Sequence, residues 1–169
     1  VDCDWSSDVC SSDLYRLDAA VAEKLADELT AICRDHGVGL AVTASRRTGD
    51  GAFEVLRRRL RDLPAVLWDG TGPNPYFGYL GMAEFIVVTC DSVSMASEAA
   101  STGKPVYVFD LPGRSAKFDA FHEGLRRAGI ARRFTGTLDT WSYLPPDDTA
   151  RVAAEVRRRL QLNPFPDRK

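Results

Sequence analysis

Apolar residues recur along the chain with two alternating spacings. In residues 18–36 they recur every three or four positions, which predicts a helix; Asp18 and Gly37 are residue types that commonly begin and end one. Short apolar runs rich in β-branched residues separate the helical stretches and predict strands. The predicted helices are 18–36, 52–63, 74–83, 94–103, 117–129 and 147–161, and the predicted strands are 39–43, 65–69, 85–89 and 105–109.

This alternation predicts an α/β fold. Strands separated by helices form parallel sheets through right-handed crossovers, so we expect one Rossmann-like parallel sheet that contains all four strands and carries helices on both faces. Ligands of such sheets bind outside the carboxyl ends of the strands. Candidate ligand-binding and catalytic residues are therefore expected in the loops that follow the strands.

Composition narrows the class of protein. The chain has 169 residues, 44% of them apolar and 27% charged, which suits a folded domain and excludes global disorder. It contains no apolar run of about 18 residues that would predict a transmembrane helix. A pI of about 5.7 argues against a nucleic-acid-binding protein.

The first fourteen residues, VDCDWSSDVCSSDL, differ from the rest of the chain. Residues 4–14 resemble the translation of a sequencing-adapter oligonucleotide, so we expect 1–14 to be a non-native, disordered tail. The domain is then expected over 15–162, followed by a loose tail over 163–169. Without residues 4–14 the formal net charge changes from −2 to +1, and two cysteines, Cys33 and Cys90, remain in the domain. Two distant cysteines predict neither a disulfide framework nor a metal site, and they fit a reducing, cytoplasmic compartment.

The most informative loop follows the strand 85–89. Asp91, Ser92 and Ser94 lie where a helix begins, and free N–H groups at a helix N-terminus bind anions such as a diphosphate. Glu98, one turn further, is placed to accept hydrogen bonds from the two hydroxyls of a ribose. Alternatively, Asp91 or Ser92 caps the helix and Glu98 completes a capping box. The sequence leaves both interpretations open.

A second candidate loop follows the strand 39–43. Ser45 and Thr48 supply hydroxyl groups of the kind that bind phosphate, and Arg46 and Arg47 add positive charge that can grip phosphate oxygens. A solvated basic turn is the structural alternative. We favour phosphate binding because two adjacent arginines follow the carboxyl end of a strand.

Two further loops carry weaker signals. Asn74 either lines a pocket or caps the short helix after it, and for Phe77 we expect core packing. After the strand 105–109, Arg114 and Lys117 form a polar loop. His122 on the next helix is a candidate acid–base residue, although a lone helical histidine is more often structural.

Several long motifs make the chain similar to a known family. It resembles the C-terminal half of the mitochondrial-fission "elongate mitochondria" family, whose bacterial members include proteins described as glycosyltransferases. The matching stretches are VTASRRT (42–48), WDGTGPNPYFGYL (68–80), IVVTCDSVSMASEA (86–99), TGKPVYVF (102–109), KFDAFH (117–122) and FTGTLDTWSYLPPDDT (134–149).

The resemblance implies the C-terminal domain of a two-domain GT-B glycosyltransferase. This domain would bind a nucleotide-diphosphate sugar, with Ser92 and Ser94 at the diphosphate and Glu98 at the ribose, while the missing N-terminal domain completes the site for an unknown acceptor. Beyond residue 14 there is no Asp-x-Asp, so we expect no metal and no cofactor besides the donor substrate.

Two other functions remain open from the resemblance. One is a non-catalytic scaffold, as in the fission relatives. The other is a nucleoside-diphosphate-sugar epimerase, which we disfavour because the chain has neither GxGxxG nor Tyr-x-x-x-Lys. The basic runs 57–59 and 157–159 are expected to be solvated. Their alternative role is docking on anionic lipid, which would place a cytoplasmic protein at the inner membrane surface.

Overall fold

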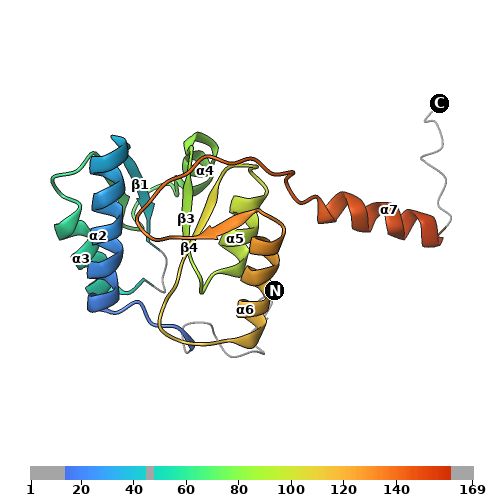
Figure 1. Cartoon of the computed structure of the whole chain (residues 1–169), viewed down its shortest axis with the longest axis horizontal. Helices are drawn as coiled ribbons and strands as arrows, with labels where there is room; N and C mark the ends of the chain where they lie inside the picture. The colour runs from blue at the N-terminus through green and yellow to red at the C-terminus, as the bar shows by residue number, and fades with distance from the viewer. Residues whose placement is uncertain (1–13, 45–47, 161–169) are drawn as a thin grey trace.

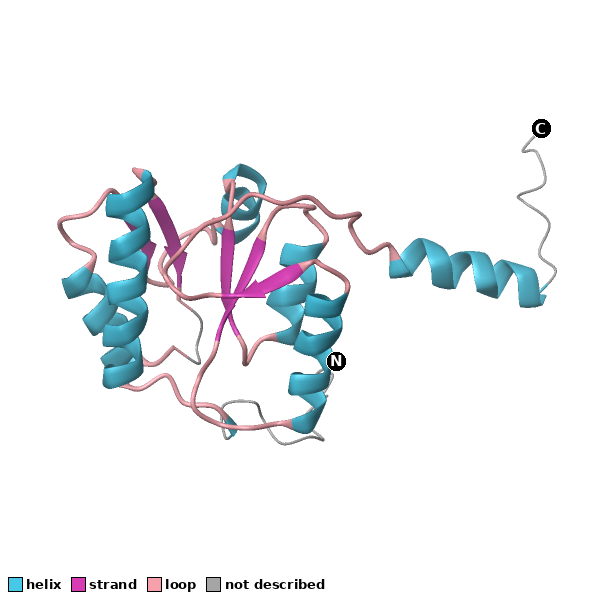
Figure 2. Cartoon of the chain, viewed as in Figure 1, coloured by secondary structure: helices cyan, strands magenta, loops and turns pink. Residues whose placement is uncertain are grey.

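The computed structural model describes residues 14–44 and 48–160, in which helices and strands alternate (Figures 1 and 2). Of the two predicted tails, 1–14 and 163–169, only Leu14 lies within the described residues. The helices are α2 (Ala19–His36), α3 (Asp50–Arg59), α4 (Tyr76–Met82), α5 (Val93–Ala100), α6 (Ala116–Arg127) and α7 (Asp148–Leu160). The strands are β1 (Leu40–Thr43), β2 (Ala65–Trp68), β3 (Ile86–Thr89), β4 (Val106–Phe109) and β5 (Ala131–Arg133).

All the strand pairs among the described residues are parallel. β1 pairs with β2, and β3, β4 and β5 pair in that order. Helices flank these sheets: α2 packs against α3 beside the first sheet, whereas α5 and α6 contact the second. The predicted α/β, Rossmann-like fold is confirmed.

The prediction of one sheet containing all four strands is wrong. Among the described residues, β1 and β2 form a two-stranded sheet, and β3 belongs to a separate three-stranded sheet. An apolar run specifies that a segment is a strand, but it does not specify the neighbour with which that strand pairs. Here a cavity, described below, separates β1 from β3.

The ends of α2 follow from two residues. The Asp18 side chain accepts a hydrogen bond from the N–H of Val21 at 2.9 Å, and this caps the first turn. Gly37 ends the helix with φ 65°, a left-handed conformation that favours glycine, and its N–H donates to the carbonyl of Cys33. Both predicted helix ends are confirmed.

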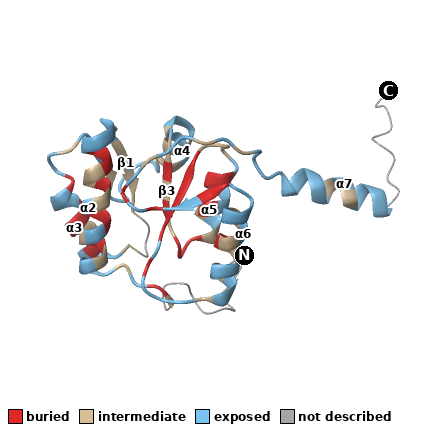
Figure 3. Ribbon diagram, viewed as in Figure 1, coloured by how far each residue is buried: buried red, intermediate tan, exposed pale blue. Residues whose placement is uncertain are grey.

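The core lies around β4. All four residues of this strand are buried, and Figure 3 shows the buried segments gathered on β3, β4 and the inner faces of the helices. β4 has a paired strand on each side and helices over its faces, so the continuous apolar run PVYVF suits its place.

The strand β5 was not predicted from the sequence. Its residues, Ala131 to Arg133, include two exposed arginines and show no apolar run. Arg132 stacks over the ring of Trp141, 4.2 Å from its centroid, and Arg133 pairs with Asp110. Contacts distant in sequence therefore stabilise β5 at the sheet edge.

The last helix, α7, projects away from the body of the molecule (Figure 1). None of its residues is buried, and Val152 and Val156 are exposed on it. Its basic residues Arg158 and Arg159 pair with Glu155 on the same helix. In the described part of the chain, no helix combines the length and apolarity needed to cross a bilayer.

Replacing the aromatic side chain at the end of β4 tests this description of the core. Phe109 is 2% exposed, so Phe109→Ala should lower the free energy of unfolding by about 3–5 kcal/mol, as cavity-forming core substitutions do. Chemical denaturation measures the change. Val152→Ala on α7, where the side chain is 58% exposed, is the control and should change stability by less than about 0.5 kcal/mol. Equal effects of the two changes would contradict the proposed core.

Candidate functional site at the carboxyl ends of the strands

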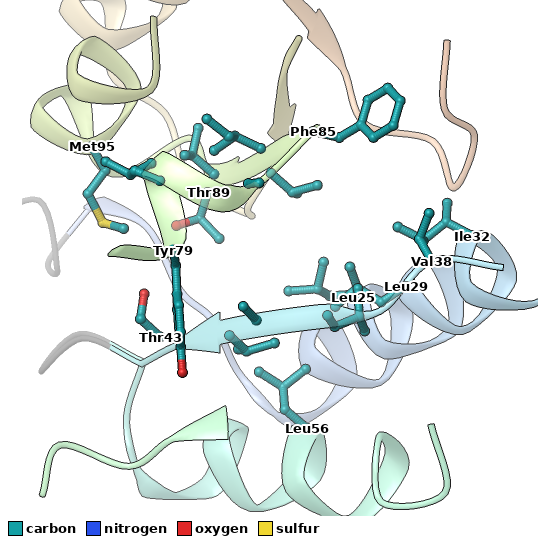
Figure 4. Close-up of a pocket in the computed structure, with 18 of the residues that line it drawn as sticks. Leu25, Leu29, Ile32, Val38, Thr43, Leu56, Tyr79, Phe85, Thr89 and Met95 are labelled. Atoms are coloured by element: carbon teal, nitrogen blue, oxygen red, sulfur yellow. The ribbon is translucent and has the colours of Figure 1, made fainter. Parts of the chain in front are cut away.

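The loops that follow β1 and β3 leave the same end of the structure. Thr43 and Thr89, which end these strands, lie toward one end of the cavity between them, whereas Val38 and Phe85 lie toward the other (Figure 4). Because β3 and β4 are parallel, the loop after β4 leaves this end as well. Thr48, Ser94 and Arg114 therefore follow strands that end at one edge.

The N-terminus of α5 is held by Ser92. The hydroxyl of this buried residue accepts a hydrogen bond from the N–H of Met95 at 3.4 Å, and its own N–H donates to the carbonyl of Thr89. Ser92 therefore caps the helix. Ser94 is exposed, and the N–H groups of Val93 and Ser94 have no hydrogen-bond partner among the described residues.

Glu98 does not complete a capping box. The N–H of Ser92 already donates to Thr89, and the Glu98 side chain instead accepts a hydrogen bond from the hydroxyl of Tyr76 at 2.6 Å. Burial, together with this hydrogen bond and the carboxylate charge, raises the pKa of Tyr76 well above its usual value. The phenol therefore stays protonated and keeps one oxygen of Glu98 in place. Sequence analysis missed this pair because no local pattern connects α4 with α5.

The residues predicted beside Tyr76 have local roles. The side-chain oxygen of Asn74 accepts from the N–H of Tyr76 at 3.0 Å, so Asn74 starts α4 as a cap would. Phe77 is 74% exposed, and the expectation that it packs in the core is wrong. It makes an edge-on contact with the ring of Tyr76 on α4, a short helix that buries no residue.

The loop after β1, which carries the two adjacent arginines, is described only in part. Ser45, Arg46 and Arg47 lie outside the described residues. Thr48 is half-buried and lines the cavity between β1 and β3 together with Asp91, a buried residue. These two residues bring the loops after β1 and β3 to the same cavity.

A second cavity, of about 520 Å³, lies beyond the end of β4. Arg114 and His122 line it, as do Asp110, Asp119 and Arg133. The Arg114 side chain is 92% exposed and its Nε lies 3.8 Å from Asp119, so this arginine is loosely held. Lys117 is exposed and does not line the cavity.

His122 and Cys90 meet in this second cavity but do not form a catalytic pair. The imidazole Nε2 lies 2.7 Å from the backbone carbonyl of Cys90, not from its thiol, so it is a donor to that carbonyl. The thiol sulfur accepts from the N–H of Leu111, and burial raises the pKa of Cys90 to about 11. An uncharged thiol is a poor nucleophile. His122, only 3% exposed, instead ties α6 to the end of β3.

No group of His, Cys, Asp and Glu side chains in 14–44 and 48–160 is arranged to hold a metal ion.

The basic run on α3 has a structural role. Arg58 and Arg59 both pair with Glu23 on α2, and Arg59 also pairs with Asp27. These arginines therefore contribute to the contact between the two helices.

Sequence comparison relates the chain to known proteins. Residues 11–160 match the model of a family described as "Mitochondrial fission ELM1". The chain belongs to this family. It is 42% identical over 149 residues to the "Mitochondrial fission protein ELM1" of Arabidopsis thaliana, an alignment that covers 86% of this chain and 35% of that protein. It is also 42% identical over 143 residues to the "Uncharacterized protein RP120" of Rickettsia prowazekii (strain Madrid E), covering 80% of this chain and 40% of that protein.

The chain therefore spans well under half the length of these two relatives. No solved structure is significantly similar to it. The family membership rests on sequence similarity along nearly the whole described domain.

A matched pair of serine substitutions separates capping from ligand binding. Ser92→Ala removes the cap of α5 and should lower the free energy of unfolding by about 1 kcal/mol. Ser94→Ala removes an exposed hydroxyl and should leave stability within about 0.5 kcal/mol of the original. Thermal or chemical denaturation compares the two proteins. A larger loss for Ser94→Ala would contradict the capping role of Ser92.

The state of Cys90 is testable by alkylation. With a pKa of about 11, only roughly one thiol in a thousand is ionised at pH 8, so iodoacetamide should modify Cys90 slowly in the folded protein. The rate should rise with pH toward 11, because the thiolate is the reacting form. Mass spectrometry assigns the label by residue, and the guanidinium-unfolded protein is the control. Alkylation of folded and unfolded protein at equal rates would show that the thiol is accessible and ionised.

Proposed function

We propose that this domain binds a nucleotide-diphosphate sugar and is the donor-binding part of a metal-independent glycosyltransferase. The observation that carries the proposal is the start of α5. There the exposed Ser94, the N–H groups of Val93 and Ser94, and Glu98 one turn further all belong to one helix at the carboxyl ends of the strands.

The diphosphate is assigned to the N-terminus of α5. The capping bond from Met95 to Ser92 satisfies one N–H group, which leaves those of Val93 and Ser94 for a ligand. Such N–H groups, the Ser94 hydroxyl and the positive end of the helix dipole favour an anion. The same groups stabilise the negative charge that develops on a leaving diphosphate, so the chemistry does not need a metal ion.

The ribose is assigned to Glu98. Tyr76 donates to Oε2 of this carboxylate, and Oε1 keeps its two lone pairs for the hydroxyls of a ribose. Since Glu98 is exposed and has no role in capping, the structural alternative raised by the sequence is weaker for it than for Ser92. Further phosphate ligands come from Thr48, Arg114 and the predicted Ser45, Arg46 and Arg47. The rest of the full-length protein supplies the acceptor site.

A non-catalytic scaffold is the competing function. The Arabidopsis relative is named a mitochondrial fission protein, and that name describes no chemical reaction. A scaffold would keep the fold without a nucleotide site. Nucleotide binding therefore distinguishes the two functions.

The experiment is a nucleotide titration of the full-length natural protein by isothermal calorimetry with UDP, GDP, ADP and dTDP. One of these should bind, and Glu98→Ala should weaken its binding by about ten- to a hundredfold, which corresponds to the loss of a charged acceptor. Glu54→Ala is the matched control: Glu54 is an exposed helical glutamate whose carboxylate accepts from Arg57, and its loss should leave affinity unchanged.

The outcomes separate the two functions. If no nucleoside diphosphate binds the folded full-length protein, the scaffold function is favoured. If one binds but Glu98→Ala has no more effect than Glu54→Ala, the ribose assignment is wrong.

A further inference from the structure

A cavity of about 840 Å³ separates the two sheets (Figure 4). All four residues of β1 and all four of β3 line it, whereas no residue of β2 or β4 does. Among the described residues β1 pairs with β2 alone and β3 with β4 alone. The cavity therefore lies between two parallel strands, each with one edge unpaired.

The backbone of β1 turns polar groups toward this cavity. The N–H of Leu40 donates to the carbonyl of Pro64, and that of Ala44 donates to Trp68. Neighbouring residues of a strand point their backbone groups to opposite sides, so Ala41 and Thr43 direct theirs away from β2.

The same reasoning applies to β3. The N–H of Ile86 donates to Pro105 and that of Cys90 to Phe109, so Val87 directs its backbone groups away from β4. Buried backbone groups are almost always hydrogen-bonded in native proteins. Ala41 is exposed and Thr43 and Val87 are half-buried in this structure. An occupant that buries their backbone groups must therefore offer N–H and C=O partners to both sides, which a strand does and an apolar small molecule does not.

Most of the side chains around the cavity are apolar; the polar ones include Thr48 and Asp91 at the carboxyl edge, and His36 and Glu84 before β1 and β3. The cavity is lined on the side of the first sheet by Leu25, Leu29 and Ile32 of α2 and by Leu56 of α3. Met95 of α5 lines it near Thr89 (Figure 4). A strand enclosed by helices on both faces has a continuous apolar run and no alternation of polar residues. An occupant that meets both requirements is an apolar strand.

The path of the chain into α2 points to the source of this strand. The N–H of Arg16 donates to the carbonyl of Pro112, and Tyr15 forms a bridge with Gly113, both in the loop after β4. The chain thus approaches Asp18 from the edge where the parallel strands end. A side chain at Gly113, which has φ 135°, would collide with the carbonyl of Leu14, so the glycine allows this close approach.

We propose that a further parallel strand, formed by the residues immediately before Tyr15 in the full-length natural protein, fills this cavity and joins the two sheets. The strand would end beside Tyr15 and continue through α2 to β1, which is a right-handed βαβ crossover onto a neighbouring strand. The completed sheet then has the order β2, β1, new strand, β3, β4, β5. This is the strand order of the classic dinucleotide-binding fold.

The segment present in this sequence does not suit that place. Residues 6–13, SSDVCSSD, contain six serines and aspartates and no apolar run. The relatives are much longer than this chain, which covers 35% and 40% of them, so a full-length member has other residues available. The proposal concerns the architecture of the sheet and does not depend on nucleotide binding.

Four substitutions in the present chain provide a test strand. Cys10→Val, Ser11→Ile, Ser12→Val and Asp13→Val create an apolar run from residue 9 to Leu14. In this variant the amide hydrogens of Ala41, Thr43 and Val87 should exchange at least about tenfold more slowly, because they gain hydrogen-bond partners. The matched control carries Ser11→Pro in place of Ser11→Ile, since proline cannot donate in a ladder.

Slower exchange in the isoleucine variant alone supports the proposal, and equal exchange in the two folded variants overturns it. Protection that grows with protein concentration would assign the cavity to a second copy and would also overturn it. The full-length natural protein provides a measurement that does not depend on the variants folding. There the amides equivalent to Ala41 and Val87 should be protected as strongly as the paired amides of β4, and rapid exchange would contradict the proposal.

Discussion

The hydrogen bonding of β4 on both sides is the constraint on which the larger sheet depends. Cys90 donates to the carbonyl of Phe109, and Phe134 donates to that of Val108, so β4 fixes where β3 and β5 end. A strand in this position has neighbours on two edges and helices over its faces, which demands that all its residues be apolar. The end of β3 in turn places the start of α5. The most promising binding groups are therefore positioned by a buried strand that carries none of them.

Several polar residues at the carboxyl edge use their side chains to begin helices. The side-chain oxygens of Ser92 and Asn74 accept hydrogen bonds from backbone N–H groups in the first turns of α5 and α4. The hydroxyl of Ser115 does the same for α6. Each of these bonds fixes a helix start, and this determines which groups remain exposed. Ser94 and Glu98 are exposed because Ser92 has already anchored the helix that carries them. Ser92 caps α5 and its neighbour Ser94 stays exposed, so the capping alternative applies to Ser92, and the proposed ligand binding is assigned to Ser94 and Glu98.

The sequence predicted the features that depend on interactions within a few residues along the chain. Asp18 and Gly37 bound α2 as expected, since a capping oxygen and a left-handed glycine act within one turn. The pattern did not reveal β5, whose arginines are held by Trp141 and Asp110, nor the pairing of Tyr76 with Glu98 across 22 positions. The division into two sheets was also missed, because apolar runs identify strands but not their neighbours. Contacts between distant segments had to come from the structure.

The short segment before α2 connects the two cavities at the carboxyl edge. Tyr15 lines both of them, is itself buried, and stacks on Phe118 of α6 at 5.8 Å between ring centroids. On one side of it lies the apolar space between β1 and β3; on the other lies the polar space with His122. Gly113 has no side chain, so the backbone of Leu14 and Tyr15 can cross between these spaces in contact with the loop after β4. Tyr15 thus lies between two parts of the carboxyl edge. The cavity between β1 and β3 suits a buried strand, and the cavity with His122 suits charged groups.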